Sequence, residues 1–290
     1  MKISFFKVLR VFFALLIFLP LLFYFCDFLN ILPHELHGLA MVQVVPAVLA
    51  GTLIALVVLF LLTLLFGRIY CSTICPLGVL QDIISRFSGR GRKKSKKGKK
   101  KRGFIYSKPQ TYWRYGILSV CIIFFIFGII SPLLLLDPYS NFGRIATNLF
   151  RPAGMMINNW VTAIATRAGN FTFYHVSIET VTVVSLIAAL VALLVVGIMS
   201  FMRGRLFCNT ICPVGSLLGL VSRFSLFKVV MDESRCTQCT LCEKACKSQC
   251  IDSKSMKIDS SRCVSCYNCL SRCKHDAIGY RFSWKSKKQM

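Results

Sequence analysis

Eight cysteines near the C-terminus have a spacing that suits metal chemistry. The pattern C-x2-C-x2-C-x3-C begins at Cys236 and is repeated from Cys263. Three closely spaced thiolates on one loop can bind three corners of an iron–sulfur cube, but the chain cannot turn sharply enough for the fourth to reach the same cube. The fourth cysteine of each run is therefore expected to bind the other cluster.

This rule assigns four cysteines to each of two [4Fe-4S] clusters. The first cluster takes Cys236, Cys239, Cys242 and Cys273. The second takes Cys263, Cys266, Cys269 and Cys246. Zinc fits this spacing poorly, because zinc sites use cysteines in pairs and three cysteines in C-x2-C-x2-C would crowd the ion.

Three residues of this region stand outside the expected ligand pattern. Lys247 and Lys274 follow the last cysteine of each run, where the bacterial two-cluster pattern has Pro. Cys250 is a ninth thiol, which we interpret as a buried residue outside the ligand set. The departures affect the turns after the motifs and leave the expected ligands unchanged.

Four further cysteines belong to an internal repeat. The segment GRIYCSTICPLGVLQDIISRFS, from Gly67, recurs from Gly204 as GRLFCNTICPVGSLLGLVSRFS, with 13 of 22 positions identical. Each copy carries a C-x3-C-P motif, and Pro76 and Pro213 suit the first turn of an amphipathic helix. Two copies of one unit are expected to bring four thiols together, namely Cys71, Cys75, Cys208 and Cys212.

Three interpretations of these four thiols remain open. They bind a third cluster or another metal, they cycle between thiol and disulfide, or they have a role without metal. A structural disulfide is not expected in a reducing compartment. The spacing does not separate the three interpretations.

The elements that position these cysteines are predicted to be membrane helices. The chain has 290 residues, 55% of them hydrophobic, and 24 are Phe. A helix needs about 20 mostly apolar residues to cross a bilayer. Four stretches qualify: residues 11–32, 44–66, 115–136 and 180–202. The first could instead be a signal peptide, but no small-x-small cleavage site follows it, so we favour an anchor.

The distribution of charge predicts the topology. The net charge is +25, but most basic residues lie between the apolar stretches, so we expect no nucleic-acid partner. A basic loop, residues 89–110, follows the second stretch, whereas residues 27–43 contain no Lys or Arg. The positive-inside rule then places the loop, both termini and all twelve motif cysteines on the cytosolic side. Its tract Arg92–Arg102 is expected to be disordered, and either fixes topology or holds anionic lipid or an acidic partner.

The connection on the opposite side offers two weaker features. Apolar residues recur at helical spacing from Met156 to Ile164, which is compatible with an interfacial helix or an ordinary loop helix. Several protonatable residues near this face could serve a quinone or a metal, or be simply solvated: His34, Glu35, His37, His175 and Glu179. No haem-binding pair of histidines is seen on the spans to carry electrons across.

Together these features predict an α-helical membrane protein with two domains. Residues 1–225 form a four-helix transmembrane domain in two repeated halves, with the two C-x3-C-P motifs. Residues 226–290 form a cytosolic α+β bacterial-type two-cluster ferredoxin domain.

This combination resembles the NapH, NosR and CcoG group of membrane polyferredoxins over residues 67–280, and is most similar to the NapH quinol dehydrogenase type. The resemblance implies a multi-pass protein of the bacterial inner membrane that acts as an electron-transfer subunit of an oxidoreductase complex. Its cofactors would be two [4Fe-4S] clusters, with an additional cluster or metal and a quinone as open alternatives. Its partners would be the lipid bilayer and redox proteins, such as an extracytoplasmic reductase or its ferredoxin or cytochrome subunit.

Three functions are compatible with this sequence. In the first, the chain passes electrons between a quinol pool or cytosolic donor and a partner reductase. In the second, it is a CcoG-like assembly factor that reduces copper and holds Cu(I) with the four repeat thiols. In the third, it is a redox sensor, although no output domain is recognisable. We favour the first.

Overall fold

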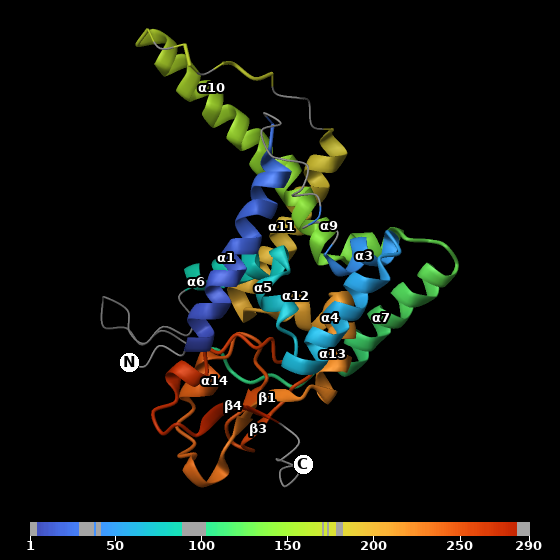
Figure 1. Ribbon diagram of the computed structural model, residues 1–290, viewed down its shortest axis with the longest axis vertical. Coiled ribbons are helices and arrows are strands. Elements are labelled where there is room, and N and C mark those ends of the chain that lie inside the picture. Colours follow the sequence, from blue (N-terminus) through green and yellow to red (C-terminus); the bar gives the residue numbers. More distant parts are fainter. Residues whose placement is uncertain are drawn as a thin grey trace.

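The computed structural model describes residues 5–28, 38, 42–88, 103–169, 171–172, 174–177 and 182–282. The described chain is mostly helical, with two small antiparallel sheets. Figure 1 shows the helices stacked above a compact layer formed by residues from about 226 onward, which we call the C-terminal module (residues 226–290, described to 282).

The first and fourth predicted spans form continuous helices. α1 covers Phe5–Cys26 and α11 covers Val183–Arg203. Both are long and apolar enough to cross a membrane by length and composition. α1 begins and ends six residues earlier than predicted, because Pro20 is accommodated inside the helix while Asp27 lies beyond its end.

The second and third predicted spans are each divided into two helices, so the four transmembrane helices stay a prediction. Residues 44–66 form α3 (Val44–Leu49) and α4 (Leu53–Phe66), and residues 115–136 form α7 (Thr111–Ile126) and α8 (Ser131–Leu136). A glycine in the left-handed region lies at each break, Gly51 with φ 66° and Gly128 with φ 78°. Such a residue ends the regular hydrogen-bond ladder of a helix.

Among the residues that the structure describes, further helical elements lie between and after these helices. They are α5 (Tyr70–Thr73), α6 (Pro76–Phe87), α9 (Pro138–Ile145), a π-helical turn (Ala146–Phe150), α10 (Arg151–Arg167), α12 (Leu206–Thr210) and α13 (Pro213–Val221), the last followed by a 3-10 turn (Ser222–Phe224). α10 confirms the helix predicted around Met156–Ile164, and it leaves Ile157 and Trp160 63% and 68% exposed.

The sequence repeat is also a structural repeat. α4, α5 and α6 form one copy, and α11, α12 and α13 form the other. Gly67 and Gly204 end the long helix of each copy with φ values of 76° and 73°. Pro76 and Pro213 occupy the first turn of the last helix, as predicted, because that position has no intrahelical N–H bond to lose.

The C-terminal module is built on short strands around the cysteine motifs. β1 (Phe227–Met231) pairs antiparallel with β4 (Ile278–Phe282), with Val229 opposite Tyr280. A second hairpin joins β2 (Ile251–Asp252) to β3 (Lys257–Ile258), and the helical pieces are α14 (Leu241–Ala245) and two 3-10 turns (Glu233–Arg235 and Leu270–Arg272). Its core contains Val229, Met231, Ile251 and Ile278 together with cysteines of both motifs.

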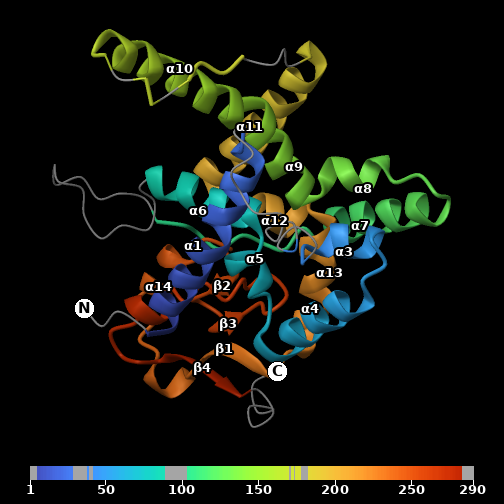
Figure 2. The same cartoon turned by 45° about the horizontal axis from the view of Figure 1, so that its top comes forward.

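One end of each of α1, α4, α7 and α11 lies against the C-terminal module, as Figure 2 shows for the start of α1. The start of α1 contacts it through the rings of Phe6 and Tyr280, 5.7 Å apart. The Tyr280 hydroxyl also donates to the carbonyl of Phe66 at the end of α4. Near the start of α7, Arg114 donates to the Ser261 carbonyl, and beyond α11 the amide of Arg205 donates to the Lys247 carbonyl. The four elements therefore alternate in direction.

Candidate functional site

The four cysteines assigned to the first cluster surround one cavity in the C-terminal module. Cys242 lies on α14 and the other three lie on loops, and all four line the same open space of about 340 Å³. Cys273 is brought to Cys236, Cys239 and Cys242 by the second motif, as the crossover rule requires. Cys239 is exposed, so this site faces solvent.

The four cysteines assigned to the second cluster lie deeper in the module. Cys246, Cys266 and Cys269 are buried, and Cys263 is half-buried. Burial raises the pKa of the Cys269 thiol well above its ordinary value, and the neighbouring sulfurs of Cys266, Cys263 and Cys246 raise it further. The four thiols are therefore close enough to affect one another's ionisation.

The two cysteine motifs share the same backbone conformation as well as the same spacing. Gln238 and Thr240 flank the second cysteine of the first motif with φ values of 50° and 60°. Ser265 and Tyr267 occupy the matching positions of the second motif, with 48° and 57°. Left-handed residues are uncommon outside glycine and turn successive N–H groups inward, forming concave sites that bind anions, iron–sulfur groups included. This conformation fits clusters that carry negative charge.

Cys250 lies against the second site. Its sulfur is 3.5 Å from that of Cys246, and it is 2% exposed. Hydrogen bonding from Cys250 lowers the pKa of Cys246 to about 7 and also lowers that of Cys263. The residue is buried, as predicted, and in addition its thiol favours the thiolate form of two assigned ligands, which metal binding requires.

The structure brings the four repeat thiols together in the helical part. Cys71 and Cys208 lie on α5 and α12, and all four thiols are 1–3% exposed. Cys75 and Cys212 cap the N-termini of α6 and α13, and the Gly215 amide donates to the Cys212 sulfur at 3.2 Å. Burial raises the pKa of Cys212 well above its ordinary value, with further contributions from Cys208, Cys75 and Cys71. Such sulfurs would be thiolates only beside a cation or metal.

Two buried arginines join the copies of the repeat reciprocally. Arg68 of the first copy donates to the Cys208 carbonyl at 3.0 Å, and Arg205 of the second copy donates to the Cys71 carbonyl. Both side chains are 0% exposed. Arg68 also places its Nη2 atom 3.8 Å from the Cys71 sulfur. Each arginine thus holds the cysteine loop of the opposite copy, with its positive charge beside the thiols.

Asp82 of α6 joins four parts of the chain at one carboxylate. Its oxygens accept from Arg205 and Arg10 at 2.9 Å and lie 3.3 Å from the Lys247 ammonium. Burial alone would raise the pKa of Asp82, but these three cations hold it far below its ordinary range. The carboxylate therefore links α1, both copies of the repeat and the C-terminal module.

Lys247 follows the last cysteine of the first motif, where the bacterial pattern has Pro. Its side chain reaches Asp82, and its carbonyl accepts from the Arg205 amide. The departure noted in the sequence thus gives the module two contacts with the repeat. Lys274 makes no ion pair with any residue that the structure describes.

The second cysteine site of the module adjoins the repeat site. Cys266 belongs to the same buried apolar cluster as Cys71, Cys75 and Cys212. Arg68, whose side chain lies beside Cys71, also donates to the Ser261 carbonyl near the start of the second motif. The predicted sites therefore follow the order first cluster, second cluster, repeat thiols.

Other predicted features fall outside this arrangement. His34, Glu35, His37, Glu179 and the tract Arg92–Arg102 lie outside the described residues. His175 is exposed. Within the described ranges no group of three or more His, Cys, Asp or Glu side chains is arranged to hold a single metal ion. A cluster differs from a single ion in that its thiolates bind four separate corners.

Sequence reasoning missed the polar residues that position the repeat thiols. Arg68 and Arg205 are identical in the two copies of the repeat, directly after the helix-ending glycine, and this identity was the available signal. Asp82 has no such signal, because Gly219 takes its place in the second copy. There the Arg114 guanidinium lies against Gly219 instead.

Comparison with known families agrees with iron–sulfur binding. The family described as a 4Fe-4S binding domain matches residues 48–95 and 185–231, less than half of the chain. These two segments contain the C-x3-C-P motifs and not the cysteines of the C-terminal module. The match supports [4Fe-4S] clusters as cofactors of this chain.

Three relatives show similarity over different lengths. An uncharacterized protein of Methanocaldococcus jannaschii, MJ0749, is 46% identical over 52 residues, 18% of this chain and 21% of its own length. YccM of Escherichia coli K12, provisionally named an electron transport protein, is 27% identical over 70% of this chain and 48% of its own. MJ0750 of M. jannaschii, also uncharacterized, is 27% identical over 69% of this chain and 67% of its own.

This chain therefore spans half or less of the first two relatives. No solved structure matches it.

Proposed function

We propose that this chain is a membrane-bound iron–sulfur protein of the NapH type that transfers electrons through a row of three cysteine sites. The single observation that carries the proposal is the buried apolar cluster that contains Cys266 together with the repeat thiols Cys71, Cys75 and Cys212. This cluster places the second cysteine site of the C-terminal module next to the repeat thiols of the helical part. The 4Fe-4S family match and the name of YccM support the same role.

Each site would be held by four of the cysteines described above. A bound [4Fe-4S] cluster supplies a group that accepts and releases one electron. The first site, with the exposed Cys239, is where a soluble donor or acceptor would dock. The repeat thiols are buried between the copies, where the Arg68 and Arg205 guanidinium groups offset the negative charge of bound thiolates.

The proposed membrane location rests on the exposed apolar surface of four helices and on the alternating direction in which the chain runs through them. Side chains of α1, α4, α7 and α11 are widely exposed, for example Ile54 at 82% and Val184 at 79%. The four elements alternate in direction and share one end with the C-terminal module. In a bacterial inner membrane this arrangement, with both termini and the module in the cytosol, satisfies the distribution of basic residues.

The donor and acceptor follow from the NapH likeness. We propose that electrons pass between a quinol pool or cytosolic donor and a partner reductase outside the cytosol, with this chain as a subunit of the oxidoreductase complex.

Breaks in α3–α4 and α7–α8 leave these elements shorter than a full span. The exposed apolar face of α10 would lie along the opposite membrane surface.

Counting iron tests the proposal directly. The anaerobically purified full chain is expected to hold about 12 iron atoms and as many acid-labile sulfides, as three cubane clusters require. A variant with Ser at Cys71, Cys75, Cys208 and Cys212 is expected to hold about 8. Cys121→Ser is the matched control, because it removes a buried thiol of α7 that belongs to no proposed site.

The same measurement separates the competing functions. Equal iron contents of about 8 in the parent and the variant would refute a third cluster. Stoichiometric Cu(I) binding by that parent, lost in the variant, would instead favour the copper-reducing assembly factor, since soft thiolates select Cu(I).

The ligand assignment in the module has its own test. We expect Cys239→Ser to remove about 4 iron atoms per chain and most electron transfer to a soluble acceptor, because an oxygen ligand replaces a thiolate poorly. The measurements are iron content and the rate of reduction of a dye acceptor by the reduced protein. Retention of all iron signals at full occupancy in this variant would show that Cys239 is not a ligand.

A further inference from the structure

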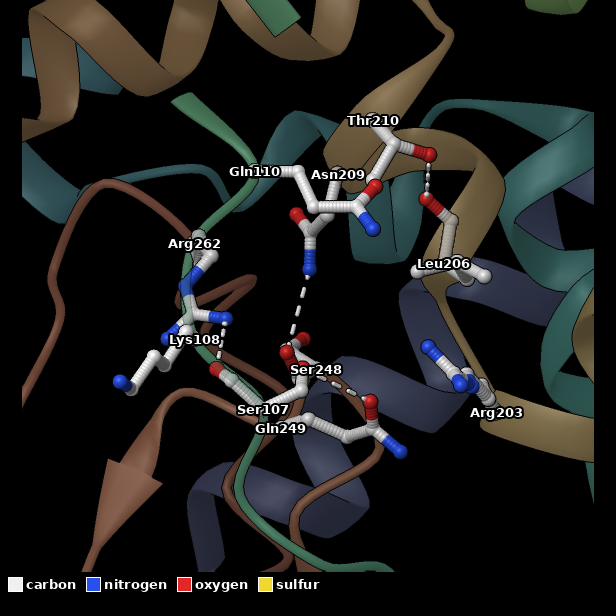
Figure 3. A pocket seen from close by; sticks show the side chains of 10 residues that line it. All are labelled: Ser107, Lys108, Gln110, Arg203, Leu206, Asn209, Thr210, Ser248, Gln249 and Arg262. Carbon is white, nitrogen blue, oxygen red and sulfur yellow. Dashed lines mark hydrogen bonds between the residues drawn. The ribbon is translucent and has the colours of Figure 1, made fainter. Parts of the chain in front are cut away.

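A polar cavity lies at the junction of the helical part and the C-terminal module, and its lining includes direct neighbours of Cys208 and Cys263 but no cysteine. Its walls come from the end of α11, from α12, from residues 107–110 and from the module. The empty space measures about 380 Å³, its mouth included. Figure 3 shows Arg203 on one wall and Arg262 on the opposite one, with the Lys108 ammonium directed outward beyond Arg262.

The charge of the lining is positive. Lys108, Arg203 and Arg262 supply three cations, and no Asp or Glu lines the cavity. Asp259 accepts from Arg262 at 2.8 Å. Within the part of the chain that the structure describes, Lys108 and Arg203 form no ion pair. Both side chains are exposed, so the cavity opens toward solvent between positive charges.

Two buried donors on the lining have no partner. Arg262 is 4% exposed and its Nη2 atom forms no hydrogen bond, and Ser248 is 5% exposed with an unbonded hydroxyl. Leaving a buried donor unsatisfied destabilises the folded state, and more so when the donor is charged. Native structures therefore satisfy nearly all such groups with protein, water or ligand.

The unsatisfied guanidinium is held in place by its other contacts. Its Nε and Nη1 atoms donate to Asp259 and to the Ser107 carbonyl, each at 2.8 Å, and it stacks 5.4 Å from the Tyr106 ring. Asn209 donates to the Ser248 carbonyl and fixes that side of the cavity (Figure 3). The remaining Nη2 donor is thus oriented before any ligand binds, which favours recognition of an oxyanion.

We propose that this cavity binds a phosphate group. A tetrahedral oxyanion can accept from the Arg262 guanidinium and the Ser248 hydroxyl together, while Arg203 supplies further positive charge at the mouth. A carboxylate offers fewer acceptors to donors that converge from several walls.

The surroundings favour the headgroup of an anionic phospholipid as the source. Arg203 is the last residue of the apolar helix α11, and the preceding Phe201 and Met202 are each 52% exposed. Tyr112 and Trp113, just beyond the cavity wall at Gln110, are 94% and 71% exposed. Exposed aromatic residues beside basic ones are typical of the membrane surface, and basic pockets between helices there bind lipid headgroups. Free phosphate shares the recognising chemistry.

Binding is measured on the full iron-loaded chain in nonionic detergent. One arm titrates phosphatidylglycerol and counts retained lipid by native mass spectrometry, and the other titrates inorganic phosphate and follows Trp fluorescence. We expect saturable binding of one phosphatidylglycerol, weakened about tenfold by Arg203→Gln and by Ser248→Ala, since each removes one contact to a charged ligand. Arg235→Gln, at an exposed arginine of the module, is the matched control.

The two titrations distinguish a phospholipid headgroup from free phosphate, and they also test whether the cavity binds either ligand. Saturable binding of either probe that both variants weaken supports the site, and the stronger of the two probes identifies the source. No saturable binding of either probe, or binding that both variants leave at the parent value, refutes it. Iron content is expected to be the same in the parent and both variants, so this result is independent of the cluster count.

Discussion

Replacing Asp82 by Ala is expected to lower the free energy of unfolding by about 3–5 kcal/mol, because it leaves a buried cation without its partner. Arg205 is 0% exposed and donates to Asp82 at 2.9 Å. Arg10 and Lys247 would lose the same carboxylate. At about 2–4 °C per kcal/mol, the apparent Tm of the detergent-solubilised chain should fall by about 6–20 °C, measured by the helical circular dichroism signal on heating.

The control for this prediction is a carboxylate that makes an ion pair in water. Asp232 lies 3.7 Å from the exposed Arg235 and caps a short turn by accepting from the Ser234 amide, so Asp232→Ala should lower the Tm much less than Asp82→Ala. A Tm within 2 °C of the parent for both Asp82→Ala and Arg205→Ala, by the same sensitivity of roughly 2–4 °C per kcal/mol, would mean that this carboxylate does not hold the four parts together.

Which cysteines lie together could be predicted because the signal is local, and the clusters that they bind stay a prediction. Spacing in the two ferredoxin-like motifs determines which thiols can reach one cube, and the cavity around Cys236 and Cys273 agrees with the crossover. The repeat predicted that Cys71 and Cys208 would meet, because duplicated units tend to pack against one another. Ligand spacing and duplication are both readable from one sequence.

The residues that position those sites could not be predicted in the same way. Asp82 and Lys247 are 165 positions apart and meet only because the module folds back on the repeat. Gly219 and Arg114 likewise come together from different helices. Helix breaks at Gly51 and Gly128 were missed because hydropathy averages over a window and a single left-handed glycine barely changes that average.

The cavity that we propose for phosphate was also outside the reach of sequence. Its cations lie in three segments, around residues 108, 203 and 262, and only Lys108 belongs to the basic loop 89–110. The conspicuous tract Arg92–Arg102 attracted the prediction of anionic lipid instead. Buried and unsatisfied donors such as the Ser248 hydroxyl become visible only when the fold is known.

Gly215→Ala is expected to remove the repeat site while leaving the C-terminal module intact. A Cβ atom at this position would lie 2.2 Å from the Cys208 carbonyl oxygen and 2.9 Å from Nη2 of Arg68. The carbonyl belongs to a proposed ligand and is the atom that Arg68 holds, so the loop must shift. We expect the loss of about 4 iron atoms per chain, with about 8 retained in the module. Iron content and the electron paramagnetic resonance signal of the reduced protein measure this loss.

The repeat supplies both a second variant and a control for this prediction. A Cβ at Gly78 would meet the Cys71 carbonyl oxygen at the same 2.2 Å, so Gly78→Ala should cause an equal loss. Gly197 lies in α11 with nothing within 4 Å, and Gly197→Ala should keep all iron and stabilise the helix by about 0.5–1 kcal/mol. The iron of the module reports whether each variant has folded. Full iron content in both Gly78→Ala and Gly215→Ala would show that the close approach of helix and cysteine loop is not what holds the repeat thiols, and the four-cysteine site would then need a different geometry.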